Sequence, residues 1–279
     1  MKKYKYPSIL SIAGSDSGGG AGIQGDLKTF SALGCFGTTA ITAVTAQNTL
    51  GISGIYSIPA EIVKAQIKAV MDDINPTAIK IGMVHTAELA RAIASVLKEY
   101  AHMNVPVIFD PVMVSTSGHQ LIENETIHFL KNELFPLALL LTPNLDEAMI
   151  LAGMQIRHIH DMEVAASEIM KTGCHAVLLK GGHLNGPDLY DVYLDKKGFK
   201  HIFESPAIDS LNTHGTGCTL SSAIACFLAR GYDLLAAIKE AKTYVHHAIE
   251  QSRDVKTGNG HGPLNHFYDP QKMIKYELD

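Results

Sequence analysis

Residues 212–219 have the sequence Asn212-Thr213-His214-Gly215-Thr216-Gly217-Cys218-Thr219, and a run of small and apolar residues follows from Leu220 to Leu228. A polar turn with two glycines that opens a helix leaves several backbone N–H groups unpaired and pointing the same way. These donors and the positive end of the helix dipole form a site for an anion. The stretch therefore predicts a turn-to-helix junction in an enzyme that handles phosphate groups.

The same order of a short apolar run, a polar or glycine-rich turn and a helical pattern recurs along the chain. The apolar runs are Ser8–Ala13, Thr38–Thr45, Ala78–Ile81, Val105–Phe109, Leu137–Leu141 and Ala176–Leu179. The helical patterns include a stretch from Gly22 to about Leu33, Ile62–Ile74, Ala87–Tyr100, Ile127–Leu134, Met162–Lys171, Thr219–Ala229 and Leu234–Gln251. Apolar strands that alternate with amphipathic helices indicate a largely parallel sheet covered on both faces.

A β-hairpin is expected at the edge of this sheet, because Tyr190–Leu194 and Phe199–Phe203 flank the turn residues Lys196–Gly198. The sequence contains no linker, repeat or low-complexity segment, so we expect one domain over residues 1–279. The predicted class is α/β, with three α/β/α layers, a central mostly parallel sheet and a small antiparallel edge hairpin. Ligands of open α/β sheets bind beyond the carboxyl ends of the strands, so one site assembled from many turns is expected there.

Composition narrows the class of protein. Hydrophobic residues make up 46% and charged residues 18% of 279, which allows a sizeable core and argues against disorder. A net charge of −5 without a long basic run argues against nucleic acid as the main partner. No segment has signal-peptide or membrane-spanning length, and the four scattered cysteines lack metal-type spacing. We therefore expect a cytoplasmic protein with reduced thiols that does not bind membranes.

The glycine-rich segment Gly14–Gly22 follows a strand and opens a helix. Its spacing does not match Gly-x-Gly-x-x-Gly, and the strand Thr38–Thr45 leads to Gln47 rather than to the acidic residue that holds a ribose. One interpretation is a tight structural turn. The other is that the missing side chains let a flat ligand lie against the backbone.

Acidic residues at two other strand ends suggest a cation site. Asn144 and Glu147 lie three residues apart at the start of a helix, and Asp110 precedes a proline. Carboxylates suit a helix N-terminus without any further role, and an aspartate can cap a turn. The functional alternative is that Glu147 and Asp110 hold Mg²⁺, often through water.

Lys180 directly follows an apolar strand and precedes two glycines. A surface lysine is the default interpretation, but the strand end places this one near the other turns. There it can neutralise a phosphate group as a point charge. Thr213 and His214, which precede the opening turn, are further candidate donors to phosphate oxygens.

Cys218 allows three interpretations. It is a small buried hydrophobe, a redox thiol without a partner cysteine nearby in sequence, or the group that accepts a proton from an attacking hydroxyl. The field at the helix N-terminus favours a thiolate and therefore the third interpretation.

Taken together, these turns resemble those of the ribokinase-like kinases, and within them the hydroxymethylpyrimidine/phosphomethylpyrimidine kinases of thiamine biosynthesis. The chain departs from the family pattern at Ser17-Gly18, where relatives often carry Pro-Ser, and at Gly25, where alanine is usual. The matching motifs cover essentially the whole chain in order: Ser11–Asp16, Gly19–Gln24, Asp26–Phe30, Thr45–Thr49, Lys80–Met83, Asp110–Met113, Thr142–Asn144, Lys180–His183, Asn212–Thr219 and Gly260–His266.

The resemblance implies a homodimeric, Mg²⁺- and ATP-dependent kinase. It would phosphorylate 4-amino-5-hydroxymethyl-2-methylpyrimidine and then the monophosphate, giving the pyrophosphate used in thiamine assembly. Gln47 would bond the polar edge of the pyrimidine, and Cys218 stands where many relatives carry an aspartate base. The implied pyrimidine contacts are Gly14, Asp26, Gln47, Met83 and Val112; Asn144, Glu147 and Lys180 would face Mg²⁺ and the phosphates; Gly215, Thr216 and Gly217 would form the anion hole.

Pyridoxal kinase activity is the nearest alternative, because pyridoxal is another flat heteroaromatic ring with a hydroxymethyl group and some similar proteins use both substrates. A non-catalytic binder of vitamin precursors is the alternative from a different class. The intact lysine, the asparagine–glutamate pair and the glycine turn argue against it. We also expect the polar segments Asn185–Asp188 and Met113–His119 to cover bound substrate.

Overall fold

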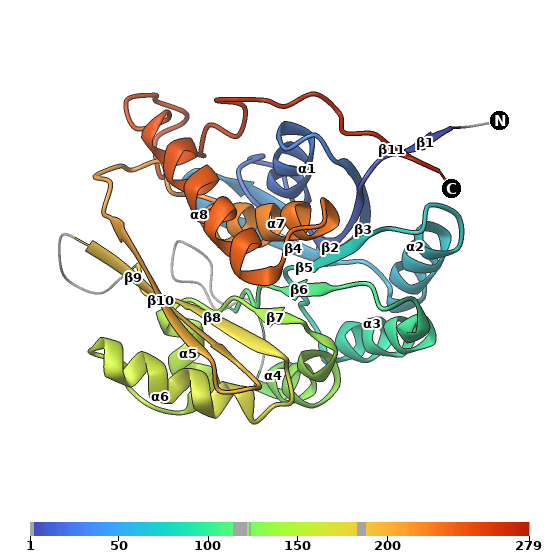
Figure 1. Cartoon of the computed structure of the whole chain (residues 1–279), viewed down its shortest axis with the longest axis horizontal. Coiled ribbons are helices and arrows are strands. Elements are labelled where there is room, and N and C mark those ends of the chain that lie inside the picture. Colours follow the sequence, from blue (N-terminus) through green and yellow to red (C-terminus); the bar gives the residue numbers. More distant parts are fainter. Residues whose placement is uncertain (1–2, 114–121, 123, 183–187, 279) are drawn as a thin grey trace.

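A central sheet runs through the whole molecule (Figure 1). The computed structural model describes residues 3–113, 122, 124–182 and 188–278. In this part of the chain nine strands form one sheet, in the order β10-β9-β8-β7-β6-β5-β2-β3-β4. The strands are β2 (Ser8–Asp16), β3 (Phe36–Asn48), β4 (Gly51–Ser57), β5 (Ala78–Ile81), β6 (Val107–Phe109), β7 (Leu140–Leu141), β8 (Ala176–Lys180), β9 (Asp188–Asp195) and β10 (Lys200–Pro206). A separate two-stranded ribbon pairs β1 (Tyr4–Lys5) with β11 (Tyr276–Glu277).

The sheet is parallel from β3 to β8 and antiparallel at both edges. The pairs β2–β3, β2–β5, β5–β6, β6–β7 and β7–β8 are parallel. At one edge β9 and β10 form the expected hairpin on β8, and at the other β4 pairs antiparallel with β3. The three-layer α/β prediction with an antiparallel edge hairpin is therefore confirmed.

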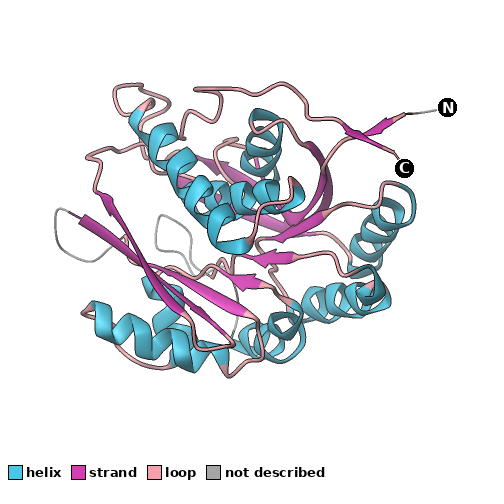
Figure 2. Ribbon diagram, viewed as in Figure 1, coloured by secondary structure: helices cyan, strands magenta, loops and turns pink. Residues whose placement is uncertain are grey.

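Helices cover both faces of the sheet, as Figure 2 shows. Successive residues of a strand point to opposite faces, so Leu10 and Ile12 belong to one core cluster while Ile9 belongs to the other. The first cluster lies under α2 (Ala60–Asp73), α3 (Ala87–Glu99), α4 (Asn124–Phe129), α5 (Leu145–Ala152) and α6 (Ile159–Met170). The second lies under α1 (Gly22–Ala32), α7 (Thr216–Ala229) and α8 (Leu234–Glu250).

Several boundaries differ from the sequence prediction for local reasons. The strand predicted to begin at Val105 begins at Val107, after Pro106, which has no N–H to donate to a sheet. The strand predicted from Leu137 is reduced to β7, because a π-helical turn and the 3₁₀ turn Phe135–Leu137 occupy the segment before it. In the described residues no helix is long and apolar enough to cross a membrane.

Strand β4 was missed by the sequence analysis. Its sequence contains two glycines and lacks a clear alternation of apolar and polar residues. It is held at the edge of the sheet by its pairing with β3. The long strand β3 carries Thr45 and Gln47 near its carboxyl end. This places these two side chains at the carboxyl edge.

Candidate active site

One cavity of about 590 Å³ opens at the carboxyl ends of the parallel strands. Most residues that the sequence predicted for the site line this cavity. They are Gly14, Gln47, Met83 and Val112 at one end, Asp110, Asn144 and Lys180 at the middle strands, and Thr213, His214, Gly215, Thr216, Gly217 and Cys218 from the turn before α7. Turns that are far apart in sequence therefore meet in one place.

The glycine turn before α7 fits closely against the first glycine-rich segment. Gly215 has a left-handed backbone, with φ of 88°, and is the N-cap residue of α7. A Cβ atom on Gly215 would overlap the carbonyl oxygen of Gly20. Gly217 and Cys218 lie in the first turn of α7, where an α-helix provides no acceptor for N–H groups, and both line the cavity. The turn thus has the geometry of an anion site.

Lys180 lies beside this turn. Its Nζ is 2.9 Å from Asp110 Oδ1, which also accepts a hydrogen bond from Thr142 Oγ1 at 3.0 Å. Burial lowers the pKa of Lys180, but the carboxylates of Asp110 and Glu147 outweigh it and raise this pKa above its ordinary value. The side chain is therefore a permanent cation close to the anion turn.

Glu147 is buried behind the cavity instead of lining it. Its Oε2 accepts the N–H of Asn144, and Asn144 Oδ1 accepts the N–H of Glu147, both at 2.8 Å. This capping box begins α5, so the structural interpretation of the pair is correct. Burial raises the pKa of Glu147 to about 7, with Lys180 lowering it and Asp110 raising it.

The raised pKa of Glu147 predicts a pH-dependent loss of stability. The Glu147 carboxyl loses its proton near pH 4.5 in the unfolded chain and near pH 7 in the folded protein. The stability that protonated Glu147 contributes is therefore fully present below pH 4.5 and is lost as the pH rises through about 7. Glutamine has no proton to lose, so this stability loss should be absent from the Glu147→Gln variant. Relative to the native protein, its free energy of unfolding should therefore rise by roughly 1–3 kcal/mol between pH 5 and pH 8. Urea unfolding at the two pH values measures this, and parallel pH profiles would contradict it.

Asp26 does not line the cavity, which corrects the expectation that it contacts the pyrimidine. Its carboxylate oxygens are 2.8 and 2.9 Å from Lys80 Nζ, and both side chains are fully buried. Ser11 and Ser222 donate to the same carboxylate at 2.5 and 2.7 Å. Lys80, which the sequence analysis did not single out, reaches the cavity wall. The position of Lys80 within an apolar strand could have predicted a buried ion pair, because a buried lysine needs a carboxylate partner.

His214 is held by a carboxylate that the sequence analysis did not assign. Its Nε2 is 2.9 Å from Asp16 Oδ2. The expected hydrogen bond from this nitrogen to a phosphate oxygen is therefore not available. Asp16 also accepts the N–H groups of Gly18, Gly20 and Ala21. Burial raises the pKa of Asp16, but the hydrogen bonds from His214 and the backbone outweigh it and hold this pKa below its usual range.

Cys218 lines the cavity and is partly exposed. Burial raises the pKa of its thiol to about 11, and the Lys80 ammonium only partly opposes this. The expectation that the helix N-terminus favours a thiolate is therefore wrong for the protein without ligands. A thiol with this pKa also lacks the reactivity of a redox sensor.

Mostly apolar residues that the sequence analysis did not assign to the site line the cavity as well. They lie at the end of β10, directly after it, or on α8: Pro206, Ala207, Ile208, His246 and Ile249. The two segments expected to cover the substrate fall largely outside the described residues, which include only Met113 and Asp188 of them.

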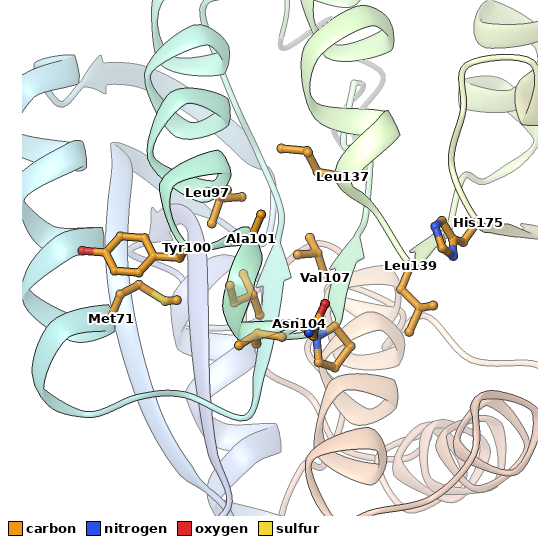
Figure 3. Close-up of a pocket in the computed structure, with 12 residues that line it drawn as sticks. Met71, Leu97, Tyr100, Ala101, Asn104, Val107, Leu137, Leu139 and His175 are labelled. Carbon is orange, nitrogen blue, oxygen red and sulfur yellow. The ribbon is translucent and has the colours of Figure 1, made fainter.

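A second cavity of about 310 Å³ lies at the opposite edge of the sheet, by the amino ends of β5 to β8 (Figure 3). Met71, Leu97 and Val107 are among its mostly apolar lining residues. It has neither a glycine turn nor a lysine–carboxylate pair among these residues. Of these two cavities, the first is therefore the one that brings the glycine turn and the lysine–carboxylate pair together.

Comparisons with known proteins agree on one family. The model of the phosphomethylpyrimidine kinase family matches residues 16–265. The chain is 48% identical to the hydroxymethylpyrimidine/phosphomethylpyrimidine kinase of Rhizobium meliloti, over 93% of this chain and 96% of the relative. A crystal structure of phosphomethylpyrimidine kinase from Clostridium difficile superposes with a TM-score of 0.76 and 43% identity, covering 87% of this chain and 99% of the other. Pyridoxal kinase from Staphylococcus aureus in complex with AMP-PCP and pyridoxal superposes with a TM-score of 0.84 and 30% identity, covering 98% and 100%.

Proposed function

The chain belongs to the phosphomethylpyrimidine kinase family and is a ribokinase-like kinase; from this premise we propose that it phosphorylates 4-amino-5-hydroxymethyl-2-methylpyrimidine and then its monophosphate. ATP is the phosphoryl donor, and the product serves thiamine biosynthesis. One observation carries the proposal. The anion turn with Lys180 and the flat glycine-lined pocket with Gln47 lie in the same cavity.

The phosphoryl group is held by charge rather than by covalent chemistry. Phosphoryl transfer depends on positioning and on neutralising the transferred charge. Lys180 supplies a fixed cation, and the backbone N–H groups of Gly217 and Cys218 supply donors at the positive end of α7. We assign the γ-phosphoryl group to this corner of the cavity, in line with the acceptor hydroxyl.

Asp110, which lines the cavity, would hold a magnesium ion that arrives with the nucleotide, and Glu147, which lies behind it, would act through water. No group of three or more His, Cys, Asp or Glu side chains fit for a metal occurs in the described residues. Mg²⁺ is usually held by one or two carboxylates together with substrate phosphates, so two carboxylates are sufficient. A divalent cation near Glu147 would favour its charged form and so lower the pKa that burial raises. Mg²⁺ would supply charge neutralisation between the phosphates.

The nucleotide base fits the apolar end of the cavity. Pro206–Ile208 and Ile249 offer apolar surface, and His246 offers a ring beside it. A flat adenine ring gains from such surroundings by burial and stacking. Thr213, Asn144 and the anion turn line the same cavity, and we assign the phosphates of the nucleotide to them.

Cys218→Ala is expected to slow the first phosphorylation much more than the second. The first acceptor is an alcohol that must lose a proton, whereas the second is an ionised phosphate oxygen. Because the thiol pKa is about 11, the ratio of first-step to second-step kcat/KM should also rise with pH in the native enzyme and not in the variant. Separate assays of the two steps measure this. Equal losses in both steps would mean that Cys218 only packs against the ligand.

Pyridoxal is the alternative acceptor, since the Staphylococcus aureus relative with the same fold is a pyridoxal kinase. Side-by-side kcat/KM values for the aminopyrimidine and pyridoxal test the proposal. We expect the aminopyrimidine to be preferred, and a preference for pyridoxal would overturn the assignment. A lack of ATP turnover with saturating Mg²⁺ would instead revive the non-catalytic binder.

We further propose a cytoplasmic homodimer. All four cysteines are free thiols, as expected in a reducing compartment. Val44 on β3, Leu50 in the turn between β3 and β4, and Tyr56 on β4 are exposed to 46%, 66% and 69%. An exposed edge with large apolar side chains favours pairing with another chain. Light scattering of the purified protein would show the mass of two chains.

A further inference from the structure

The side-chain amide of Gln47 lies next to two groups that each have a single hydrogen to donate. Its Oε1 is placed 3.1 Å from Thr45 Oγ1, and its Nε2 is placed 3.4 Å from His214 Nε2. Thr45 Oγ1 is also 2.9 Å from the carbonyl oxygen of Ser15, and His214 Nε2 is 2.9 Å from Asp16 Oδ2. The two ends of an amide are alike in shape, so their hydrogen-bond partners decide which end is oxygen.

The Asp16–His214 contact fixes the first hydrogen. Asp16 is 2% exposed and accepts three backbone N–H groups, so its carboxylate acts only as an acceptor. The hydrogen in the 2.9 Å contact therefore belongs to His214 Nε2, whether the ring is neutral or charged. A ring nitrogen that carries a hydrogen has no lone pair left to accept another. The end of Gln47 that faces His214 must therefore be the carbonyl oxygen.

Thr45 fixes the second hydrogen. The carbonyl of Ser15 has no hydrogen to give, so the 2.9 Å contact uses the single hydroxyl hydrogen of Thr45. Thr45 Oγ1 can then only accept a hydrogen bond from Gln47, so the NH₂ end of the amide must face it. Two independent neighbours thus select the same orientation, with Nε2 toward Thr45 and Oε1 toward His214. A half-turn of the amide gives an Nε2 hydrogen to the lone pair of Thr45 Oγ1, and it turns Oε1, rather than a second N–H group, toward the Nε2–H that His214 already donates to Asp16.

We propose that Thr45 and the Asp16–His214 pair lock the Gln47 amide in this orientation and so determine which acceptor ring the enzyme prefers. This inference rests on the proposed function. In this orientation the amide keeps lone pairs on Oε1 and one hydrogen on Nε2 for a ligand, at fixed ends. A ring with an aromatic amine beside a ring nitrogen matches both, because the amine donates to Oε1 and the nitrogen accepts from Nε2. Pyridoxal carries a phenolic hydroxyl and no aromatic amine, so it cannot make the same pair of bonds.

Thr45→Val tests the lock, because valine keeps the shape of threonine and lacks the hydroxyl. Without the hydroxyl the amide can rotate, so the KM for the aminopyrimidine should rise about five- to tenfold with kcat nearly unchanged. The KM for pyridoxal should change much less, and the preference between the two acceptors should fall by a similar factor. Thr45→Ser restores the hydroxyl and should recover most of the preference. Thr45→Ala removes the hydroxyl with a smaller side chain and serves if the valine variant folds poorly.

Thr38→Val is the matched control. Thr38 lies on the same strand, and its Oγ1 donates to the carbonyl of Ile9 at 3.0 Å, but it is not among the residues that line the cavity. The control should lose comparable stability and leave the preference unchanged. Calorimetric binding of the aminopyrimidine without ATP gives a second readout, in which Thr45→Val should weaken binding by the same factor.

The two hypotheses fail in different ways. If the native enzyme phosphorylates the aminopyrimidine but Thr45→Val leaves its binding unchanged, or shifts both acceptors equally, the lock is wrong. If the native enzyme neither binds nor phosphorylates the aminopyrimidine, the proposed function itself fails and the lock falls with it.

Discussion

Lys180→Met is expected to lower kcat about 10²–10³-fold for both acceptors, the size of effect seen when one preorganised charge-stabilising group is removed. The ammonium of Lys180 lies next to the anion turn as a fixed cation, and in the proposed mechanism both phosphoryl transfers need it. Methionine keeps the length of the side chain and removes the charge. Steady-state kinetics with saturating ATP and Mg²⁺ measure the loss.

Stability has to be separated from catalysis in this variant. Removing Lys180 leaves Asp110 as a buried carboxylate without its cation, which costs roughly 3–5 kcal/mol of folding free energy. The double variant Lys180→Met/Asp110→Asn removes both charges, so it should recover stability and remain inactive. Lys197→Met, on the exposed hairpin turn, is the surface control and should behave as the native enzyme. Near-native activity in Lys180→Met would refute the assigned role.

Gly215→Ala is expected to disable the enzyme through geometry alone. Alanine would sit at a left-handed φ of 88°, and its Cβ would overlap the carbonyl oxygen of Gly20. The anion turn and the glycine-rich segment Gly14–Gly22 would then separate, and a shift of about 1 Å costs on the order of 10²-fold in rate. We expect at least that loss in kcat/KM for both acceptors, together with a lower melting temperature.

Gly231→Ala is the matched control for this substitution. Gly231 has almost the same φ, 90°, but a Cβ there meets nothing within 4 Å. It therefore carries the strain of a left-handed alanine, about 1–2 kcal/mol, without the overlap. Thermal unfolding and kcat/KM of the two variants separate the effect of the strained backbone from that of the overlap with Gly20. Equal effects on activity would show that the contact between the turn and Gly20 is unimportant.

The layers of the fold could be predicted because each buried strand is a continuous apolar run followed by a turn and an amphipathic helix. Strand β4 could not, because it lies at an exposed edge and its pairing with β3 comes from the tertiary structure. The carboxyl-edge position of the site followed from the same alternation, since the chemistry-bearing turns all come after strands. Local sequence therefore determined where the groups gather.

Most predicted site residues line the cavity, but the contacts of the buried polar side chains could not be predicted, because they depend on long-range partners. Asp26 appears in a motif that resembles a substrate contact, yet Lys80, 54 residues away, takes its carboxylate. His214 is similarly taken by Asp16, 198 residues away. Burial raises the pKa of Cys218, contrary to the expectation, and outweighs the Lys80 ammonium, which lowers it.

The most direct test of the central claim is a ³¹P NMR time course of the native enzyme with ATP, Mg²⁺ and 4-amino-5-hydroxymethyl-2-methylpyrimidine. One cavity that holds both acceptors predicts that a monophosphate ester signal appears first and then gives way to the two signals of a pyrophosphate ester. ADP should form at two equivalents for each pyrimidine consumed. A monophosphate that accumulates and goes no further, or ATP that stays unconsumed, would contradict the account.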